Sequence, residues 1–119
     1  MTSSGGAQGS TLVLTQFTLK PGRTASAYRE FSLGWLRAEM TGFPSVVRFL
    51  DFDVLGYLPA AAEWELVELI EVSSVEAFRR DNESATGAAA AAAWGEWVER
   101  SSVVFLHDLA AERPAEGAG

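Results

Sequence analysis

The chain has 119 residues, the size of one compact domain whose core needs neither disulfides nor a structural metal. It contains no cysteine, which excludes disulfides, thiolate zinc sites and cysteine nucleophiles and is compatible with the reducing cytoplasm. The 16 Asp and Glu residues outnumber the 9 Lys and Arg residues, and the formal net charge of -7 argues against nucleic acid or an anionic membrane surface as a partner. We therefore expect a cytoplasmic protein with one domain.

The two ends of the chain differ from its middle in composition. Residues 1–10, MTSSGGAQGS, are rich in Gly and Ser and lack the positive charge that begins a signal peptide. The apolar residues that follow are too few, and too often interrupted by Thr and Gln, to span a membrane. We expect a flexible N-terminal arm at 1–10, a single domain at 11–110 and a flexible C-terminal tail at 111–119.

The first half of the domain shows strand and helix patterns in turn. β-Branched and aromatic residues over 12–19 predict a strand that ends at the Pro21-Gly22 turn. Apolar residues then recur every three or four positions over 23–40, which predicts a helix that ends near Gly42. Two further strand patterns, 44–58 and 63–72, are joined by the short link 59–62 and predict an antiparallel hairpin.

The second half predicts a broken helix and a last strand. Ser73 and Glu76 have the spacing of a capping box, which begins a helix. The turn-prone segment 81–87 breaks that helix, and the alanine-rich segment 88–100 resumes it, with Trp94, Trp97 and Val98 as its packing stripe. Residues 102–109, SVVFLHDL, predict the closing strand.

This βαββαβ order is that of the ferredoxin-like α+β fold. In that fold a four-stranded antiparallel sheet carries both helices on one face. The other face stays bare, and a bare, partly apolar face on a small domain indicates a partner, most simply a second copy related by a two-fold axis. We therefore expect a homodimer.

Two charged residues interrupt apolar stripes on the predicted hairpin. Strand side chains alternate, so Arg48 and Glu68 each lie on the even-numbered face of their strand. A register that pairs even with even positions brings the two charges to one wall. Because buried charges need partners, the two residues either form a structural ion pair or are exposed at an edge of the sheet, or they line a polar pocket for a ligand.

The odd-numbered face of the hairpin is rich in carboxylates. Paired carboxylates can ligate a hard cation or divide the roles of acid and base, but their spacing here fits no metal motif. We interpret this face as solvated and expect no metal. Its acidic residues are Asp51, Asp53, Glu63, Glu65 and Glu71.

His107 is the sole histidine of the chain. Alternation groups it with the apolar Val103, Phe105 and Leu109, where it is either an ordinary buried histidine with a hydrogen-bond partner or a catalytic group. Its side chain is the one whose unperturbed pKa suits proton transfer near neutral pH. Acid/base chemistry would therefore use His107 or a perturbed carboxylate.

The sequence carries no motif of a known catalytic or phosphate-binding device. It has no Gly-rich phosphate loop in a strand-to-helix context, no G-x-S-x-G elbow and no H-E-x-x-H pair. It does have 4 Trp, 7 Phe and 2 Tyr residues, which suit a flat organic ligand as well as a core.

Four segments carry a resemblance to a known family. FTLKPG before the first helix, FPSVVRFLDFDVLGYL, WELVELIEVSSVEAF and the terminal VVFLHDL resemble the dimeric α/β-barrel superfamily and, within it, the RedY-like (HapK-like) proteins of bacterial pigment and bisindole biosynthesis. The resemblance implies a homodimer whose two sheets form a barrel, with a small-molecule pocket between each sheet and its helices. The superfamily includes cyclases, cofactor-independent monooxygenases, haem-degrading enzymes and proteins without known chemistry, so the fold alone does not assign the reaction.

The hypothesis that follows is a cofactor-independent cyclase or tailoring enzyme for an indole- or polyketide-derived aromatic intermediate. In it His107 moves the proton, Arg48 and Glu68 orient or polarise the substrate, and no cofactor takes part. The alternatives are a non-catalytic small-molecule-binding or partner-stabilising module and a small cofactor-independent monooxygenase. The expected pocket-shaping residues are Trp35, Phe52 and Trp64.

Overall fold

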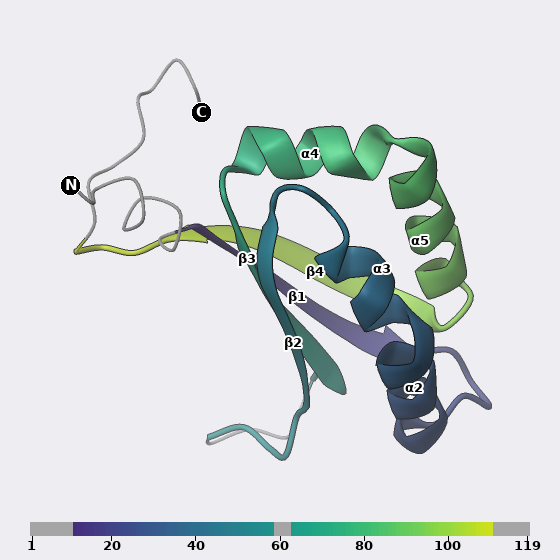
Figure 1. Ribbon diagram of the computed structural model, residues 1–119. Helices are drawn as coiled ribbons and strands as arrows, with labels where there is room; N and C mark the ends of the chain where they lie inside the picture. The colour runs from purple at the N-terminus through teal and green to yellow at the C-terminus, as the bar shows by residue number, and fades with distance from the viewer. Residues whose placement is uncertain (1–10, 59–62, 111–119) are drawn as a thin grey trace.

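The computed structural model describes residues 11–58 and 63–110 (Figure 1). The predicted arm at 1–10, the link at 59–62 and the tail at 111–119 lie outside the described residues. The elements in chain order are β1 (Thr11–Leu19), α2 (Ala25–Phe31), the π-helical turn η1 (Ser32–Leu36), α3 (Arg37–Thr41), β2 (Val46–Asp53), β3 (Leu66–Val72), α4 (Val75–Glu83), α5 (Ala85–Gly95) and β4 (Val98–His107).

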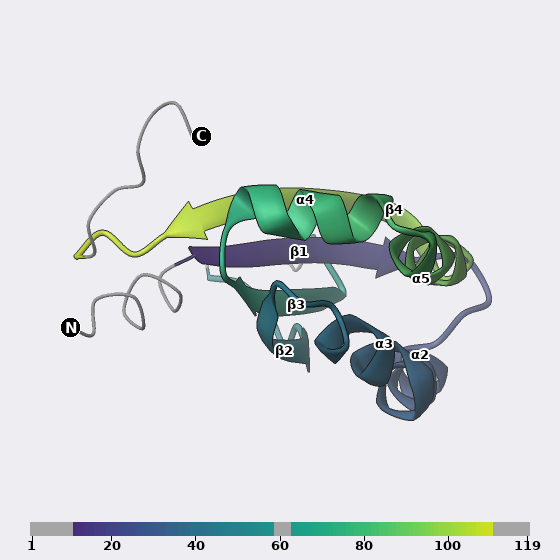
Figure 2. The same ribbon diagram turned by 45° about the horizontal axis from the view of Figure 1, so that its top comes forward.

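The strands form one antiparallel sheet in the order β2-β3-β1-β4. The helices lie on one side of this twisted sheet, as Figures 1 and 2 show from two directions. The predicted ferredoxin-like α+β fold is therefore confirmed. No helix within the described part of the chain is long and apolar enough to cross a membrane.

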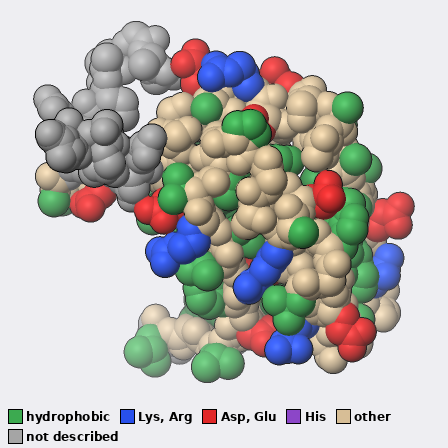
Figure 3. All heavy atoms as spheres, in the orientation of Figure 1, with side chains coloured by type: hydrophobic (Ala, Val, Ile, Leu, Met, Phe, Trp, Pro, Cys, Tyr) green, Lys and Arg blue, Asp and Glu red, His purple; other side chains and the backbone are tan. Residues whose placement is uncertain are grey.

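Alternation along β1 places the core on the helix-covered face. Val13 and Phe17 are buried there, whereas the intervening residues, which point to the other face, are half-buried. The ring of Phe17 packs edge-on against Tyr28 of α2, with ring centroids 5.3 Å apart. In the orientation of Figure 3, side chains of both charge signs are scattered over the surface, without a large patch of either.

The first helix contains a π-helical turn that the sequence pattern did not predict. In η1 the Arg37 N–H donates to the Ser32 carbonyl, five residues back, instead of four. The predicted helix over 23–40 is otherwise confirmed, since Thr24 caps α2 by accepting from Ala27 N–H at 3.1 Å and α3 ends at Thr41. π-Helical turns are frequent at functional sites.

The break between α4 and α5 is confirmed, with a shifted cap at its start. Ser74, not Ser73, caps α4 through a 3.0 Å bond from Ala77 N–H, and Ser84 caps α5 in the same way through Gly87 N–H. The two helices approach closely at Gly87, where a Cβ atom would lie 2.2 Å from the Asp81 carbonyl oxygen. Only glycine fits this junction.

The predicted helix over 88–100 is wrong at its C-terminal end. α5 ends at Gly95, and β4 begins at Val98, opposite Leu19 of β1. Lys20 N–H also donates to the Trp97 carbonyl at 2.9 Å. Pairing with the long β1 strand thus overrides the helical spacing of the apolar residues.

The hairpin does not keep even positions opposite even positions along its whole length. Val46 lies opposite Val72, as even-to-even pairing requires, but the register shifts between Val46 and Arg48. Beyond the shift, Asp51 lies opposite Glu68. A one-residue shift exchanges the two faces of a strand, so the odd positions of β2 face the helices.

Candidate functional site

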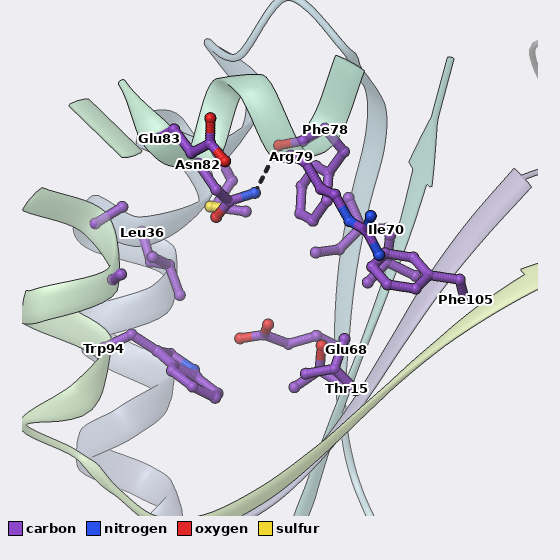
Figure 4. Close-up of a pocket in the computed structure, with 15 residues that line it drawn as sticks. Thr15, Leu36, Glu68, Ile70, Phe78, Arg79, Asn82, Glu83, Trp94 and Phe105 are labelled. Atoms are coloured by element: carbon purple, nitrogen blue, oxygen red, sulfur yellow. Dashed lines mark hydrogen bonds between the residues drawn. The ribbon is translucent and has the colours of Figure 1, made fainter. Parts of the chain in front are cut away.

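A pocket of about 390 Å³ lies between the helices and the sheet (Figure 4). Strands β1, β3 and β4 form its floor, and the helices form its walls. Its lining is mostly apolar, as is usual for a small-molecule site. The lining residues are Val13, Thr15, Leu36, Met40, Glu68, Ile70, Phe78, Arg79, Asn82, Glu83, Ala90, Ala91, Trp94, Val103 and Phe105.

Glu68 is the buried acid of this pocket. It lies in the middle of β3 on the helix-covered face and is 5 % exposed. Its carboxylate extends from the sheet toward Trp94 and Leu36 (Figure 4). Burial raises the pKa of Glu68 from 4.5 to about 7, the charge of Asp51 also raises it, and the hydrogen bond from Tyr28 opposes the rise. Glu68 is therefore poised between its two protonation states near neutral pH.

Tyr28 holds the Glu68 carboxylate from the side of α2. Its hydroxyl donates to Glu68 Oε2 at 2.8 Å. Burial and the charge of Glu68 raise the pKa of Tyr28 above its usual range, so the phenol stays protonated and remains a donor. The rings of Phe17, Phe31 and Trp97 pack around it, with centroids 5.3, 5.6 and 5.7 Å away. This packing fixes the hydroxyl in place.

Trp94 brings a third polar atom close to the same carboxylate. Its indole Nε1 is buried and makes no hydrogen bond of ordinary geometry to the described residues. It nevertheless faces Glu68 closely enough to lower the pKa of that carboxyl, as Tyr28 does. A ligand that approaches Glu68 in the pocket would also meet this N–H.

Asp51 is a further buried polar residue next to Glu68, on the neighbouring strand β2. Opposite Glu68 on β2, it accepts a hydrogen bond from Ser32 of η1 and forms an ion pair with Arg37, whose Nε donates at 3.1 Å. Its side chain is 11 % exposed, so the expectation that it lies on a solvated face is wrong. The hydroxyl that donates to Asp51 belongs to Ser32, the first residue of the π-helical turn.

Arg48 lies on the opposite face of the sheet from Glu68. It is paired with Glu71, with 3.3 Å between Arg48 Nε and Glu71 Oε1, and its side chain is 63 % exposed. Arg48 and Glu68 therefore do not share one wall, because the register shift turns Arg48 away from the pocket, and of the alternatives left open the exposed one holds for Arg48.

His107 shares a face of β4 with Val103 and Phe105, as alternation predicts, and the pairing with β1 shows that this is the helix-covered face. It is the last residue of β4, opposite Thr11. Val103 and Phe105 line the pocket, but His107 lies beyond that lining. The structure therefore does not bring His107 and Glu68 together at one site.

The three aromatic residues expected to shape the pocket lie outside its lining. Trp35 projects from η1, is 36 % exposed and stacks on Phe31 with centroids 5.7 Å apart. Phe52, opposite Val67, faces away from the helices and is 47 % exposed. Trp64 precedes β3, and the Arg100 guanidinium lies 4.3 Å from its ring centroid.

Several pocket residues were not recognised from the sequence. Trp94 belonged to a predicted helical stripe, as did Tyr28, the core residue that bonds Glu68, but nothing in the spacing distinguishes a site residue from an ordinary core residue. Thr15 lies opposite Glu68 and Val103 in neighbouring strands, a relation that appears only once the strand order is known. The signal available in the sequence was that Thr15 is a polar residue on the otherwise mostly apolar buried face of β1.

This arrangement can transfer a proton inside an apolar pocket. Glu68 accepts a proton when ionised and returns it when protonated, and Tyr28 holds it in both states. Within 11–58 and 63–110, no group of three or more His, Asp or Glu side chains is arranged to hold a metal ion. Fold and site together define a ferredoxin-like protein with a largely apolar pocket that contains an acid of raised pKa.

The chain belongs to the REDY-like protein HapK family, whose model matches residues 11–109. The crystal structure of HapK from Hahella chejuensis is similar to it, with 25% identity, a TM-score of 0.71 and coverage of 88% of this chain and 98% of that chain. Comparison with curated proteins finds no match.

Two further solved structures share the fold at lower identity. One is a dimeric ferredoxin-like protein of unknown function from Thermobifida fusca, 17% identical with a TM-score of 0.65, covering 84% of this chain and 92% of that one. The other is SnoaB, a cofactor-independent oxygenase from Streptomyces nogalater, 17% identical with a TM-score of 0.64, covering 85% and 94%. At this identity they support the fold alone.

Proposed function

We propose that this protein is a cofactor-independent tailoring enzyme that acts on an aromatic intermediate of bacterial natural-product biosynthesis. The observation that carries the proposal is Glu68, an acid with a pKa of about 7 that lines an otherwise largely apolar pocket and is hydrogen-bonded to Tyr28. Membership of the REDY-like family supports the same direction. Acids with such raised pKa values are concentrated at catalytic sites.

In this mechanism Glu68 both removes and returns a proton. Its carboxylate accepts a proton from an acidic C–H or N–H bond of the ligand, and the resulting carboxylic acid delivers that proton to another ligand atom. Tyr28 keeps the carboxyl oriented throughout. The apolar walls hold the aromatic rings in one conformer, so that a cyclisation has its reacting atoms in contact.

The proposal transfers the acid/base role from His107 to Glu68. His107 lies beyond the pocket lining, and Arg48 lies on the other face of the sheet. A His107→Ala variant is therefore expected to keep the exchange activity described next, and loss of that activity would return the role to His107.

A carbon-acid probe tests the proposed proton transfer. We suggest 2-tetralone, an aromatic ketone with an acidic CH₂ group, whose exchange with D₂O is followed by NMR. The wild-type protein should accelerate exchange, and Glu68→Gln should abolish the acceleration. Glu99→Gln, which changes an exposed Glu of β4, is the matched control and should retain it. Equal exchange by wild type and Glu68→Gln would refute the role of Glu68.

A cofactor-independent oxygenase is the second candidate, since SnoaB shares the fold. The same pocket would then deprotonate an electron-rich aromatic ligand before it reacts with oxygen. Oxygen consumption with such a ligand, measured with an electrode, separates this activity from cyclisation. Binding without any conversion would favour the non-catalytic module instead.

We also propose that the protein is a homodimer, paired through the bare face of the sheet. That face exposes apolar side chains, including Phe52, Val104 and Leu106. Similar ferredoxin-like proteins are described as dimeric. A second copy that packs its own bare face here would cover these side chains.

A further inference from the structure

Arg79 is a positive charge at the wall of the pocket. It comes from α4 and lines the pocket together with Asn82 and Glu83. Its guanidinium carbon lies 5.5 Å from the ring centroid of Phe105, over the floor formed by β4 (Figure 4). Arginine stacked on an aromatic ring keeps its N–H groups available at the edge of the guanidinium plane.

This charge has no carboxylate partner within 11–58 and 63–110. The ion pairs in that part of the chain involve Arg37, Arg48 and Arg100, and none involves Arg79. Glu83 lies one helical turn away and also lines the pocket, yet the guanidinium lies over Phe105 instead. The protein has a net charge of -7, yet this arginine beside an apolar pocket has no ion-pair partner in the described part of the chain. Its guanidinium is therefore free to bind an anionic group of a ligand.

The two charged residues Glu68 and Arg79 determine the orientation in which an anionic ligand would bind in the pocket. Glu68 lies on β3 and repels a carboxylate once it is ionised. Arg79 attracts one from the side of α4. An aromatic acid would therefore place its rings near Trp94 and Glu68 and its carboxylate at Arg79.

We propose that Arg79 is a specificity-determining residue that selects aromatic ligands carrying a carboxylate. The inference rests on the proposed function, because it names the class of ligand that the same pocket accepts. The guanidinium can donate two parallel hydrogen bonds to the two carboxylate oxygens, and an uncharged amide offers it a single acceptor oxygen.

A matched pair of probes tests this proposal. Binding of 2-naphthylacetate and 2-naphthylacetamide, which differ in charge and little in size, is measured by calorimetry at about pH 6, where most of Glu68 is protonated. The wild-type protein should bind the acid about fivefold to tenfold more tightly than the amide. The NMR signal of the Trp94 indole N–H should shift with either probe, because both enter the pocket.

Two arginine variants separate the pocket charge from the general charge of the helix. Arg79→Gln should bind the acid and the amide equally. Arg80→Gln removes the neighbouring arginine of α4, which is exposed as Arg79 is but lies outside the pocket lining, and should keep the preference of the wild type. A preference that survives in Arg79→Gln, or a Trp94 signal that does not move, would overturn the proposal.

The outcome is independent of whether Glu68 is the catalytic acid. Glu68→Gln should keep the preference for the acid while it loses proton exchange with 2-tetralone. If the preference is absent but exchange depends on Glu68, only the role of Arg79 fails. If the preference is present and exchange does not depend on Glu68, only the proposed function fails.

Discussion

The Tyr28 hydroxyl donates a 2.8 Å hydrogen bond to Glu68 Oε2, and both residues are buried on the helix-covered face of the sheet. The bond joins α2 to the middle of β3, 40 residues apart in the chain. It links the stability of the core to the protonation of the one acid that lines the pocket from the sheet.

Removing the hydroxyl should make Glu68 a weaker acid. A hydrogen bond donated to a carboxylate stabilises its ionised form, so Tyr28→Phe should raise the pKa of Glu68 above about 7. Titration of the ¹³C-labelled carboxyl by NMR measures this pKa. An unchanged or lower value in Tyr28→Phe would mean that the hydrogen bond does not stabilise the carboxylate.

Asp51→Asn should change the same pKa in the opposite direction. The charge of Asp51 raises the pKa of Glu68, and the substitution removes that charge while it keeps an oxygen for the Ser32 hydroxyl. The same NMR titration should therefore give a lower pKa. If Tyr28→Phe and Asp51→Asn shifted the pKa of Glu68 in the same direction, the opposite effects assigned to these two neighbours would be contradicted.

Glu68 should make the protein less stable as the pH rises. Its folded-state pKa of about 7 exceeds the ordinary 4.5, so between these pH values the unfolded chain has released a proton that the folded chain still binds. The free energy of unfolding, relative to that of Glu68→Gln, should then fall on the order of 3 kcal/mol from about pH 4 to pH 8. Urea unfolding across this range measures it, and parallel curves for the two proteins would exclude the effect.

Gly87→Ala should destabilise the junction of α4 and α5. The added Cβ would lie 2.2 Å from the Asp81 carbonyl oxygen and 2.6 Å from the Asn82 Cα, so the two helices would have to move apart. We expect a loss of about 1–3 kcal/mol in unfolding experiments. Gly95→Ala, whose Cβ would meet no atom within 4 Å, is the control and should be close to neutral.

A charge on the bare face should dissociate the proposed dimer. Val104→Glu places a carboxylate opposite Leu14 on that face, where pairing of two copies would bury it. Sedimentation should show a dimer for the wild type and a monomer for Val104→Glu. Leu33→Glu, at an exposed helical position, should remain dimeric. A monomeric wild type would refute the dimer directly.

The architecture could be predicted well from the sequence, because it depends on the alternation of apolar residues in strands and on turn-prone segments that end helices. The alternating apolar residues of β3 placed Glu68 on a buried face, and the turn-prone segment 81–87 separated α4 from α5. These signals are local, so one sequence suffices to detect them.

The site was harder to predict because it depends on register. A shift between Val46 and Arg48 exchanged the faces of β2, which brought Asp51 to Glu68 and turned Arg48 outward. Likewise, Val98 reads as part of a helical stripe until its pairing with Leu19 is known. Such pairings are set by contacts distant in sequence, and no local pattern carries them.

The π-helical turn also bears on how this helix tolerates insertions and deletions. The buried residues Tyr28, Ser32, Leu36 and Met40 follow one another at intervals of four. In a regular α-helix that interval drifts by about 40° per step, so the wider turn at η1 helps keep the four on one face. Deletion of Gly34 should leave a regular α-helix in which the same four residues, now at intervals of four, three and four, still share one face. The π-helical turn thus accommodates one additional residue without turning the buried residues outward.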